Sequence, residues 1–439
     1  MFTSHNQHYM KTLFFLTLVS IISFSCKKDS SIPNNPTVTV ATLTTTTITS
    51  ISASVATGGG NISSDGGAAV TARGICWGTT TSPAVSGNHT TDASGTGSFT
   101  SSLTGLNPST IYYVRAYATN SAGTAYGNEV NFTTSTPDVY VVGLESNGTH
   151  NVAKIWKNGV ATLVTDGTND AEFRWLNITG TDIYVAGSER SGANYVAKVW
   201  KNGVATSLTN GTTNAFARSV FVSGTDVYVA GDENIGGVDF ATIWKNAVPT
   251  RLTSGPTGSA LNSMYISGTD IYATGNEGVV AKMWKNGIPV SFINGVNNDY
   301  VFSVYVAGTD VYVAGTQFNG TNGIATVWKN GIAVSLTTGA NDADARSVYV
   351  VGTDVYVAGE EYNGTNYVAK VWKNGVPTSL TTGVSFAIAF SVCVSGTDVY
   401  VTGNENNGIK SVAKIWKNGV STSLTNGSTN ASGYMILVK

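Results

Sequence analysis

One phrase, with Lys-Val-Trp-Lys-Asn-Gly-Val as its best copy, recurs in seven versions after residue 137 and constrains the fold more than any other feature. Each version follows a second phrase, Asp-Val/Ile-Tyr-Val/Ala, whose copies lie 44 residues apart, with one interval of 40. That second phrase begins at Asp138, Asp182, Asp226, Asp270, Asp310, Asp354 and Asp398. A unit repeated at this period cannot bury its apolar face alone, so the seven copies must pack against one another.

Each repeat contains four strand-like runs separated by turn residues. In the best copy the runs are Ser347–Val351, Asp354–Ala358, Tyr367–Trp372 and Val376–Leu380. Asn374-Gly375 joins the third run to the fourth, and Asn-Gly is the strongest two-residue hairpin signal. Four short strands at this period are typical of a propeller blade. The sequence therefore predicts a seven-bladed β-propeller over residues 138–439, with the first run of each repeat innermost.

The two ends of the repeat array predict how the ring closes. The first repeat begins directly at its second run, at Asp138, so its first run is missing. The last repeat is followed by one extra run, Gly433–Val438, in the position of a first run. We expect this C-terminal run to complete the first blade, because pairing it there leaves no open sheet edge.

The tryptophan of the recurrent phrase is expected to lie in the core between blades. One stands at the same place in every repeat: Trp156, Trp200, Trp244, Trp284, Trp328, Trp372 and Trp416. Burying an indole removes roughly 150–250 Å² from water. At about 25 cal/mol per Å², this gives an upper bound near 4–6 kcal/mol each. The alternative is a solvent-facing tryptophan stack that binds sugars.

Residues 37–135 predict a separate domain of short alternating strands. Leu106, Pro108, Tyr112, Val114 and Ala116 fall at the spacing of the fibronectin type III signature, which this segment resembles. The resemblance implies a β-sandwich with Tyr112 as the corner tyrosine, acting as a spacer or minor adhesion module. The whole chain is thus expected to be all-β.

Cysteine usage gives no disulfide framework, because the three cysteines lie in three different segments. Cys76 and Cys393 are expected to be small buried hydrophobic residues. Cys26 differs, because it ends a secretory signal with one positive residue, Lys11, and an apolar run over Leu13–Ile22. That run is too short to span a membrane.

Ser23-Phe-Ser-Cys26 resembles the lipobox of bacterial lipoproteins, in which the cysteine is diacylated and becomes the new N-terminus. The resemblance implies a signal peptide over 1–25, lipidation at Cys26 and a linker over 26–36. It places the protein in the cell envelope, anchored in the outer membrane and exposed at the surface. Taken together, the chain resembles a bacterial lipoprotein with a fibronectin type III-like domain and a seven-bladed propeller.

Composition narrows the choice of function. Only 11% of residues are charged and the formal net charge is −2, so no basic surface indicates nucleic-acid binding. The sequence has no Ser-His arrangement, metal-ligand cluster, phosphate-binding loop or dinucleotide fingerprint. We therefore predict no catalytic residue, no cofactor and no metal ligand.

The candidate binding residues lie at the end of the blades that carries the longer loops. A polar residue stands two positions after the glycine of each second run: Glu145, Glu189, Glu233, Glu277, Gln317, Glu361 and Glu405. The residue before each first run is Arg174, Arg218, Asn262, Phe302, Arg346, Phe390 or, in the C-terminal run, Gly433. Hairpin register is expected to pair Arg174 with Glu189, Arg218 with Glu233 and Arg346 with Glu361.

Two interpretations of these residues remain open. The charges either form pairs within a blade that support the loops, or they form a site. In the second interpretation Glu145 and Glu405, which have no polar partner at the expected position, have free carboxylates that bind a cation or a polyol. At the opposite end, seven Asp and seven Lys are expected to form surface pairs, each worth about 0–1 kcal/mol.

Three functions follow from this organisation. The first is a membrane-anchored binding, adhesion or scaffold protein that presents the loop end to a glycan or a surface protein. The others are a glycan-acting enzyme that uses loop-end carboxylates and an inert spacer. The short connection Ser135-Thr-Pro137 predicts that residues 37–135 attach beneath the opposite end, so that the loops face outward.

Overall fold

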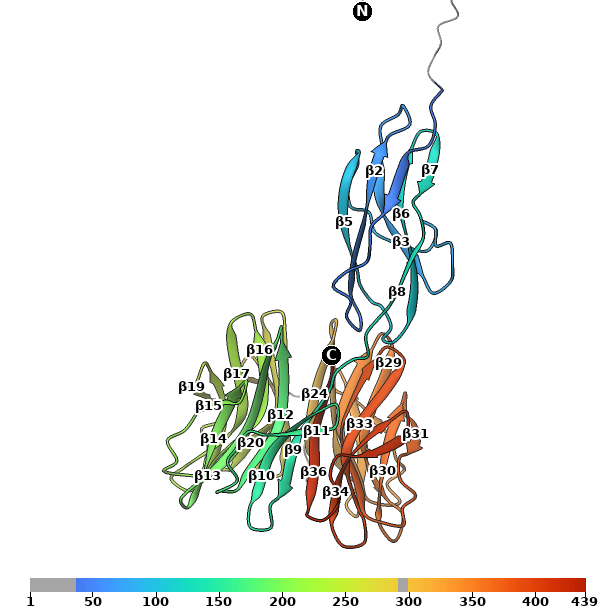
Figure 1. The fold of residues 1–439 in the computed structure, drawn as a ribbon. Coiled ribbons are helices and arrows are strands. Elements are labelled where there is room, and N and C mark those ends of the chain that lie inside the picture. The colour runs from blue at the N-terminus through green and yellow to red at the C-terminus, as the bar shows by residue number, and fades with distance from the viewer. Residues whose placement is uncertain (1–36, 291–298) are drawn as a thin grey trace, which may run out of the picture.

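The computed structural model describes residues 37–290 and 299–439. The predicted signal peptide, Cys26 and the linker lie outside the described residues. Every regular element in these ranges is a β-strand, and the strands are gathered in antiparallel sheets (Figure 1). This confirms the all-β prediction.

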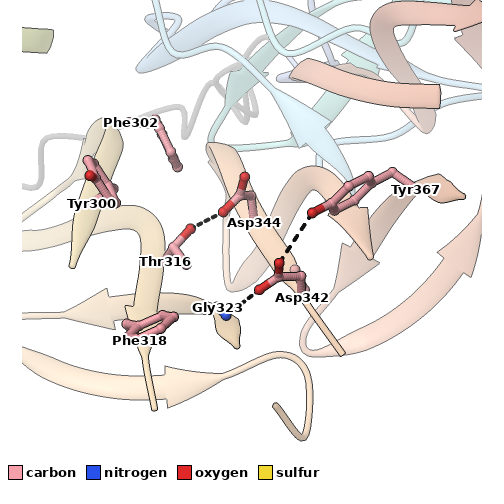
Figure 2. Close-up of a pocket in the computed structure, with 9 residues that line it drawn as sticks. Tyr300, Phe302, Thr316, Phe318, Gly323, Asp342, Asp344 and Tyr367 are labelled. Carbon is pink, nitrogen blue, oxygen red and sulfur yellow. Dashed lines mark hydrogen bonds between the residues drawn. The ribbon is translucent and has the colours of Figure 1, made fainter. Parts of the chain in front are cut away.

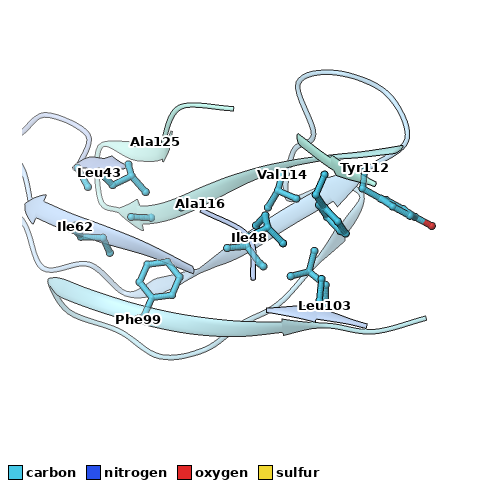
Figure 3. Packing of buried hydrophobic residues seen from close by; sticks show 14 of the residues in the cluster. Leu43, Ile48, Ile62, Phe99, Leu103, Tyr112, Val114, Ala116 and Ala125 are labelled. Carbon is cyan, nitrogen blue, oxygen red and sulfur yellow. The ribbon is translucent and has the colours of Figure 1, made fainter. Parts of the chain in front are cut away.

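Residues 37–135, the two-sheet region, form one three-stranded and one five-stranded sheet. The smaller sheet contains β1 (Thr42–Thr45), β2 (Ala56–Ser64) and β5 (Gly97–Leu103). The larger contains β3 (Ala72–Gly78), β4 (Asn88–His89), β6 (Ile111–Asn120), β7 (Gly123–Tyr126) and β8 (Val130–Thr133). Alternate residues of both sheets share one apolar core, with Ile62 and Leu103 facing Val114 and Ala116 (Figure 3).

Tyr112 is buried at the edge of this core, where its ring stacks on Phe132 with centroids 5.8 Å apart. Its hydroxyl accepts a hydrogen bond of 2.9 Å from the backbone N–H of Asn107, five residues upstream. The contact ties the end of the preceding loop to β6, as expected of a corner tyrosine. Cys76, also in this region, is buried and free, as predicted.

Residues 138–439, the seven-sheet region, form seven four-stranded antiparallel sheets. Their first strands are β12 (Ala171–Thr179), β16 (Ala215–Ser223), β20 (Ser259–Ser267), β24 (Tyr300–Ala307), β28 (Ala343–Val351), β32 (Ala387–Ser395) and β36 (Ala431–Val438). The second strands are β9 (Val139–Ser146), β13 (Asp182–Ser191), β17 (Asp226–Ile235), β21 (Asp270–Glu277), β25 (Asp310–Phe318), β29 (Asp354–Tyr362) and β33 (Asp398–Asn406).

The third and fourth strands lie farther out in each sheet. The third strands are β10 (Asn151–Lys157), β14 (Asn194–Lys201), β18 (Val238–Lys245), β22 (Val280–Lys285), β26 (Gly323–Lys329), β30 (Tyr367–Lys373) and β34 (Ser411–Lys417). The fourth are β11 (Val160–Leu163), β15 (Val204–Ser207), β19 (Val248–Arg251), β23 (Ile288–Val290), β27 (Ile332–Ser335), β31 (Val376–Ser379) and β35 (Val420–Ser423). We call the end with the Gly-Thr and Asn-Gly turns the turn end, and the other the loop end.

The C-terminal strand completes the first sheet, whose order is β11-β10-β9-β36. Val438 pairs with Val139 and Ile436 with Val141. Asp138 and Lys439 exchange two backbone hydrogen bonds of 2.7 and 2.9 Å. The predicted completion of the first repeat by the last run is therefore confirmed.

The first strands face one another around a shared centre. Each contacts the first strand of the next sheet, and β36 in turn contacts β12. Five serine hydroxyls accept a hydrogen bond from a backbone N–H of the neighbouring first strand: Ser219, Ser263, Ser303, Ser347 and Ser391. One cavity of about 360 Å³ is lined by residues of all seven first strands, including Tyr305 and Tyr349, whose tilted rings lie with their centroids 5.0 Å apart. The prediction that the first run is innermost is confirmed.

The repeated tryptophans lie between neighbouring sheets and are at most 2% exposed. Trp372, for example, packs against Val348 and Val357 of its own sheet and against Tyr312 and Ala314 of the previous one. This confirms their core role, and a solvent-facing tryptophan stack is excluded. The Asn-Gly turns hold Asn374 at φ 51° and Gly375 at φ 81°, as a tight hairpin requires.

The two-sheet region sits at the turn end of the seven-sheet region (Figure 1). A Cβ placed on Gly396, in the turn between β32 and β33, would lie 2.7 Å from Cδ of Pro108. The predicted attachment beneath the turn end is confirmed. None of the described residues belongs to a helix long and apolar enough to cross a membrane.

Candidate functional site

A repeated β-bulge builds the centre of the loop end. In each first strand one residue is skipped by the register, as when Phe173 pairs with Gly187 and Trp175 with Ala186, which leaves Arg174 unpaired. The bulge brings the strands so close that a Cβ on Gly187 would lie 2.1 Å from the backbone oxygen of Glu172. This close approach explains the glycine found at that position of each second run.

The bulged residues gather around one opening, which we call the mouth. It has a volume of about 250 Å³. Its lining consists of Arg174, Trp175, Arg218, Asn262, Phe302, Arg346, Phe390 and Tyr434. None of the described residues that line it is acidic, so the surface offered to a ligand is cationic and aromatic.

The three arginines of the mouth are oriented by carboxylates that do not themselves line it. Arg174 Nη2 donates to Glu172 Oε2 at 2.7 Å, and Arg218 Nε donates to Asp232 Oδ1 at 2.8 Å. Arg346 Nε donates to Glu360 Oε1 at 2.8 Å, and its Nη2 donates to Asp344 Oδ2 at 2.8 Å.

Aromatic rings complete the positioning of two guanidinium groups. The Cζ of Arg174 lies 4.4 Å from the ring centroid of Tyr434, and that of Arg346 lies 5.0 Å from Phe302 and 5.7 Å from Phe390. A guanidinium has five N–H donors. Within the described residues, Nη1 of Arg174, Arg218 and Arg346 donates no hydrogen bond, which leaves donors for a ligand.

Burial changes the protonation of these pairs. Burial raises the pKa of Glu360 to about 8 although Arg346 opposes the shift, and it raises the pKa of Asp232 against the opposing effect of Arg218. Burial also opposes the charge on Arg174 and Arg346, but their carboxylate partners outweigh it and raise the pKa of both guanidinium groups. The arginines therefore stay charged at every physiological pH.

The structure corrects the predicted Arg–Glu pairs. Glu189, Glu233 and Glu361 do not meet Arg174, Arg218 and Arg346, which bind the carboxylates described above. Arg218 and Arg346 instead pair with the residue directly after the glycine, Asp232 or Glu360. Successive residues of a strand point to opposite faces, and the bulge turns the arginine to the face of that residue.

The ring of glutamates is a set of ion pairs within each sheet, as the structural alternative held. Each of the six glutamates has a lysine or arginine side chain within 4 Å. The pairs are Lys154–Glu145, Lys198–Glu189, Arg251–Glu233, Lys282–Glu277, Lys370–Glu361 and Lys414–Glu405. Gln317, the one neutral member, faces β26, which has Thr326 where five other third strands carry this lysine.

The expectation of free carboxylates at Glu145 and Glu405 is wrong, because Lys154 and Lys414 of the adjacent third strand bind them.

The prediction that Gly433 stands at the position of Arg174 in the C-terminal run is also wrong. The register of β36 skips Tyr434, which lines the mouth in its place. The first strands begin earlier than predicted, so these positions lie inside them: β28 begins at Ala343, four residues before the expected Ser347.

Asp232, Glu172, Asp344 and Glu360 belong to the site and were missed. For Asp232 and Glu360 the available signal was variation, because at the position after the glycine the other repeats carry Leu144, Ser188, Asn276, Thr316 and Asn404. At the turn end, by contrast, all seven expected Lys–Asp pairs form, at 2.6–2.8 Å. Cys393 is buried and free, as predicted.

Within residues 37–290 and 299–439, no cluster of three or more His, Cys, Asp and Glu side chains could hold a metal ion. No family model matches the chain, and no curated protein is similar to it. The proposals below therefore rest on the geometry of the described residues and on the sequence.

Proposed function

We propose that the seven-sheet region is a seven-bladed β-propeller carried on a fibronectin type III-like sandwich. Seven consecutive four-stranded sheets whose first strands touch in order, from β12 round to β36 and back, support the propeller. A three-stranded and a five-stranded sheet over one core, together with the Tyr112 hydroxyl contact, support the sandwich.

We further propose that residues 1–25 direct export and that Cys26 carries the acyl chains that tether the protein to the outer membrane. More than one acyl chain gives stable anchoring. The test is Cys26→Ser in the full chain. The variant is expected in the soluble exported fraction, and membrane retention equal to that of the wild type would contradict the anchor.

In this arrangement the protein is a tethered surface-binding protein whose mouth receives an acidic group of its partner. The observation that carries this proposal is the lining of the mouth, which contains three arginines and aromatic rings and, among the described residues, no acidic side chain. Guanidinium groups suit carboxylate, sulfate and phosphate groups because their N–H donors match these anions in geometry. The turn end faces the two-sheet region and the anchor, so the mouth faces outward.

The test uses soluble Cys26→Ser protein on arrays of glycans and surface proteins. Bound partners are expected to carry acidic groups, and binding is expected to weaken as salt rises. Arg174→Gln is the preferred variant, since its partner Glu172 is only partly buried and tolerates the loss better than Asp232 or Glu360. It should weaken binding about ten-fold or more.

Arg251→Gln is the matched control. It removes an Arg–Glu pair of 3.6 Å on the outer strand β19, away from the mouth, and should leave binding unchanged. A binding affinity that changes neither with salt concentration nor in the Arg174→Gln variant would contradict the proposal.

A further inference from the structure

A second pocket opens at the loop end, beside the mouth, between the β24–β27 sheet and the β28–β31 sheet. It has a volume of about 460 Å³, within the range of small-molecule sites. Figure 2 shows Tyr300, Phe302 and Phe318 on one side, Tyr367 on the other, and carboxyl groups between them. The neighbouring mouth shares only Phe302 with this lining.

The pocket exists because one repeat lacks a side chain. Gly323 begins β26 opposite Phe318, at the register position where β14 has Tyr195 and β30 has Tyr367. The Tyr195 ring packs at 5.2 Å against Phe216 of the next sheet and fills the corresponding space. A Cβ on Gly323 would lie 2.6 Å from Cγ2 of Thr316, so the site accommodates only glycine without rearrangement.

Two carboxylates present acceptors to the pocket. Asp342 Oδ1 accepts a hydrogen bond of 2.6 Å from the backbone N–H of Gly323, and its Oδ2 accepts one of 3.3 Å from the Tyr367 hydroxyl. Asp344 accepts from the Thr316 hydroxyl and, at 2.8 Å, from Arg346. A carboxylate has about four acceptor positions, so each retains capacity for hydroxyl donors of a ligand.

The charges favour a neutral ligand. An anion would meet the carboxylates of Asp342 and Asp344. Arg346 lies outside this lining but binds Asp344, so it offsets one of the two negative charges that would attract a cation. The walls of the pocket are apolar aromatic rings, and hydrogen-bond acceptors lie between these rings. This arrangement suits a molecule with C–H faces and several hydroxyl groups.

We propose that this pocket binds a neutral saccharide, with one sugar ring against Tyr300 and Phe318 and its hydroxyl groups donating to Asp342 and Asp344. The pocket is separate from the anion-receiving mouth, so either proposal can fail without the other. A longer glycan could occupy both, because the two openings adjoin at Phe302.

The test is saturation-transfer NMR on the Cys26→Ser protein with cellobiose, lactose and maltose, and with tetramethylammonium as a cationic probe. At least one disaccharide is expected to receive saturation, strongest at its C–H protons, whereas tetramethylammonium receives none. Asp342→Asn, which loses carboxylate acceptor capacity, and Tyr300→Ala, at a half-exposed position, should each weaken that binding about ten-fold or more.

Asp170→Asn is the matched control, because Asp170 precedes β12 as Asp342 precedes β28 and its carboxylate likewise accepts from a backbone N–H, that of Asn151. It should leave saccharide binding unchanged, and circular dichroism should show all variants folded. Binding of none of the disaccharides, binding of tetramethylammonium instead, or equal loss in Asp170→Asn would each overturn the proposal.

Discussion

The two ends of the seven-sheet region use the same repeat in opposite ways. At the turn end every sheet has the same arrangement: an aspartate that accepts from a lysine and an asparagine, beside a tyrosine ring 5.2–5.4 Å from the lysine nitrogen. At the loop end the bulged residues and the residues directly after the strand glycine differ from sheet to sheet, and buried ionisable side chains such as Glu360 occur.

This difference indicates that the turn end has a structural role and that the loop end carries the candidate site. Half-exposed lysines at the turn end, such as Lys373, pair with an aspartate in high dielectric, where an ion pair adds little. The pairs of the mouth differ from one another, from the partly exposed Arg174–Glu172 to Arg346 with the buried Glu360, and a purely structural repeat does not require such variety.

Deleting Gly433–Lys439 should have the largest effect, because this segment belongs to both ends. It supplies most of β36, the hydrogen bonds to Asp138 at the turn end, and Tyr434 at the mouth. Its loss exposes the edge of β9, and we expect a destabilisation of about 5 kcal/mol, comparable to the whole stability of many domains. Thermal unfolding and size-exclusion chromatography measure it. An unchanged melting temperature would refute the role given to β36.

A direct comparison of the ends substitutes one cation at each. Arg346→Met leaves the buried carboxyl of Glu360 and the partly exposed Asp344 without their hydrogen-bond donor and should cost about 1–3 kcal/mol. Lys373→Met removes an exposed partner of Asp354 and should leave the melting temperature unchanged. Denaturant unfolding measures the free energy of unfolding of both variants. Equal losses would show that the two ends do not differ in this respect.

The buried carboxyl of Glu360 predicts a pH dependence located at the loop end. Its pKa rises from the ordinary 4.5 to about 8, so between these values the folded state holds a proton that the unfolded state has lost. Stability should therefore fall as pH rises through this window, by roughly 1 kcal/mol per pH unit. Glu360→Gln should flatten the profile in urea unfolding from pH 5 to 8. A profile identical to that of the wild type would show that another group governs it.

The smallest effect concerns the one irregular hairpin of the turn end. Ala247 adopts φ 65°, where the other six turns have glycine. Left-handed strain of about 1–2 kcal/mol in alanine is partly offset by the entropy that glycine loses. Ala247→Gly should thus stabilise by about 0.5 kcal/mol, and Gly375→Ala should destabilise by a similar amount. Urea midpoints measure both, and shifts of the opposite sign would contradict this explanation.

The local features of the molecule followed from the sequence. Asn374-Gly375 specified a hairpin because both residues tolerate positive φ, and Trp372 specified a core position because it recurs within an apolar strand. The missing first run before Asp138 and the extra run after residue 432 predicted the pairing of β36 with β9. These inferences depend on contacts within one repeat or on counting runs.

At the loop end, the pairing of charges depends on the tertiary structure. The partner of Arg346 is Glu360 rather than Glu361 because a bulge shifts the register by one residue, and a one-residue shift moves a side chain to the other face. The pocket at Gly323 depends likewise on Asp342 and Asp344 of the next sheet. Contacts between neighbouring sheets involve residues of different repeats, and the pattern within one repeat carries no information about them.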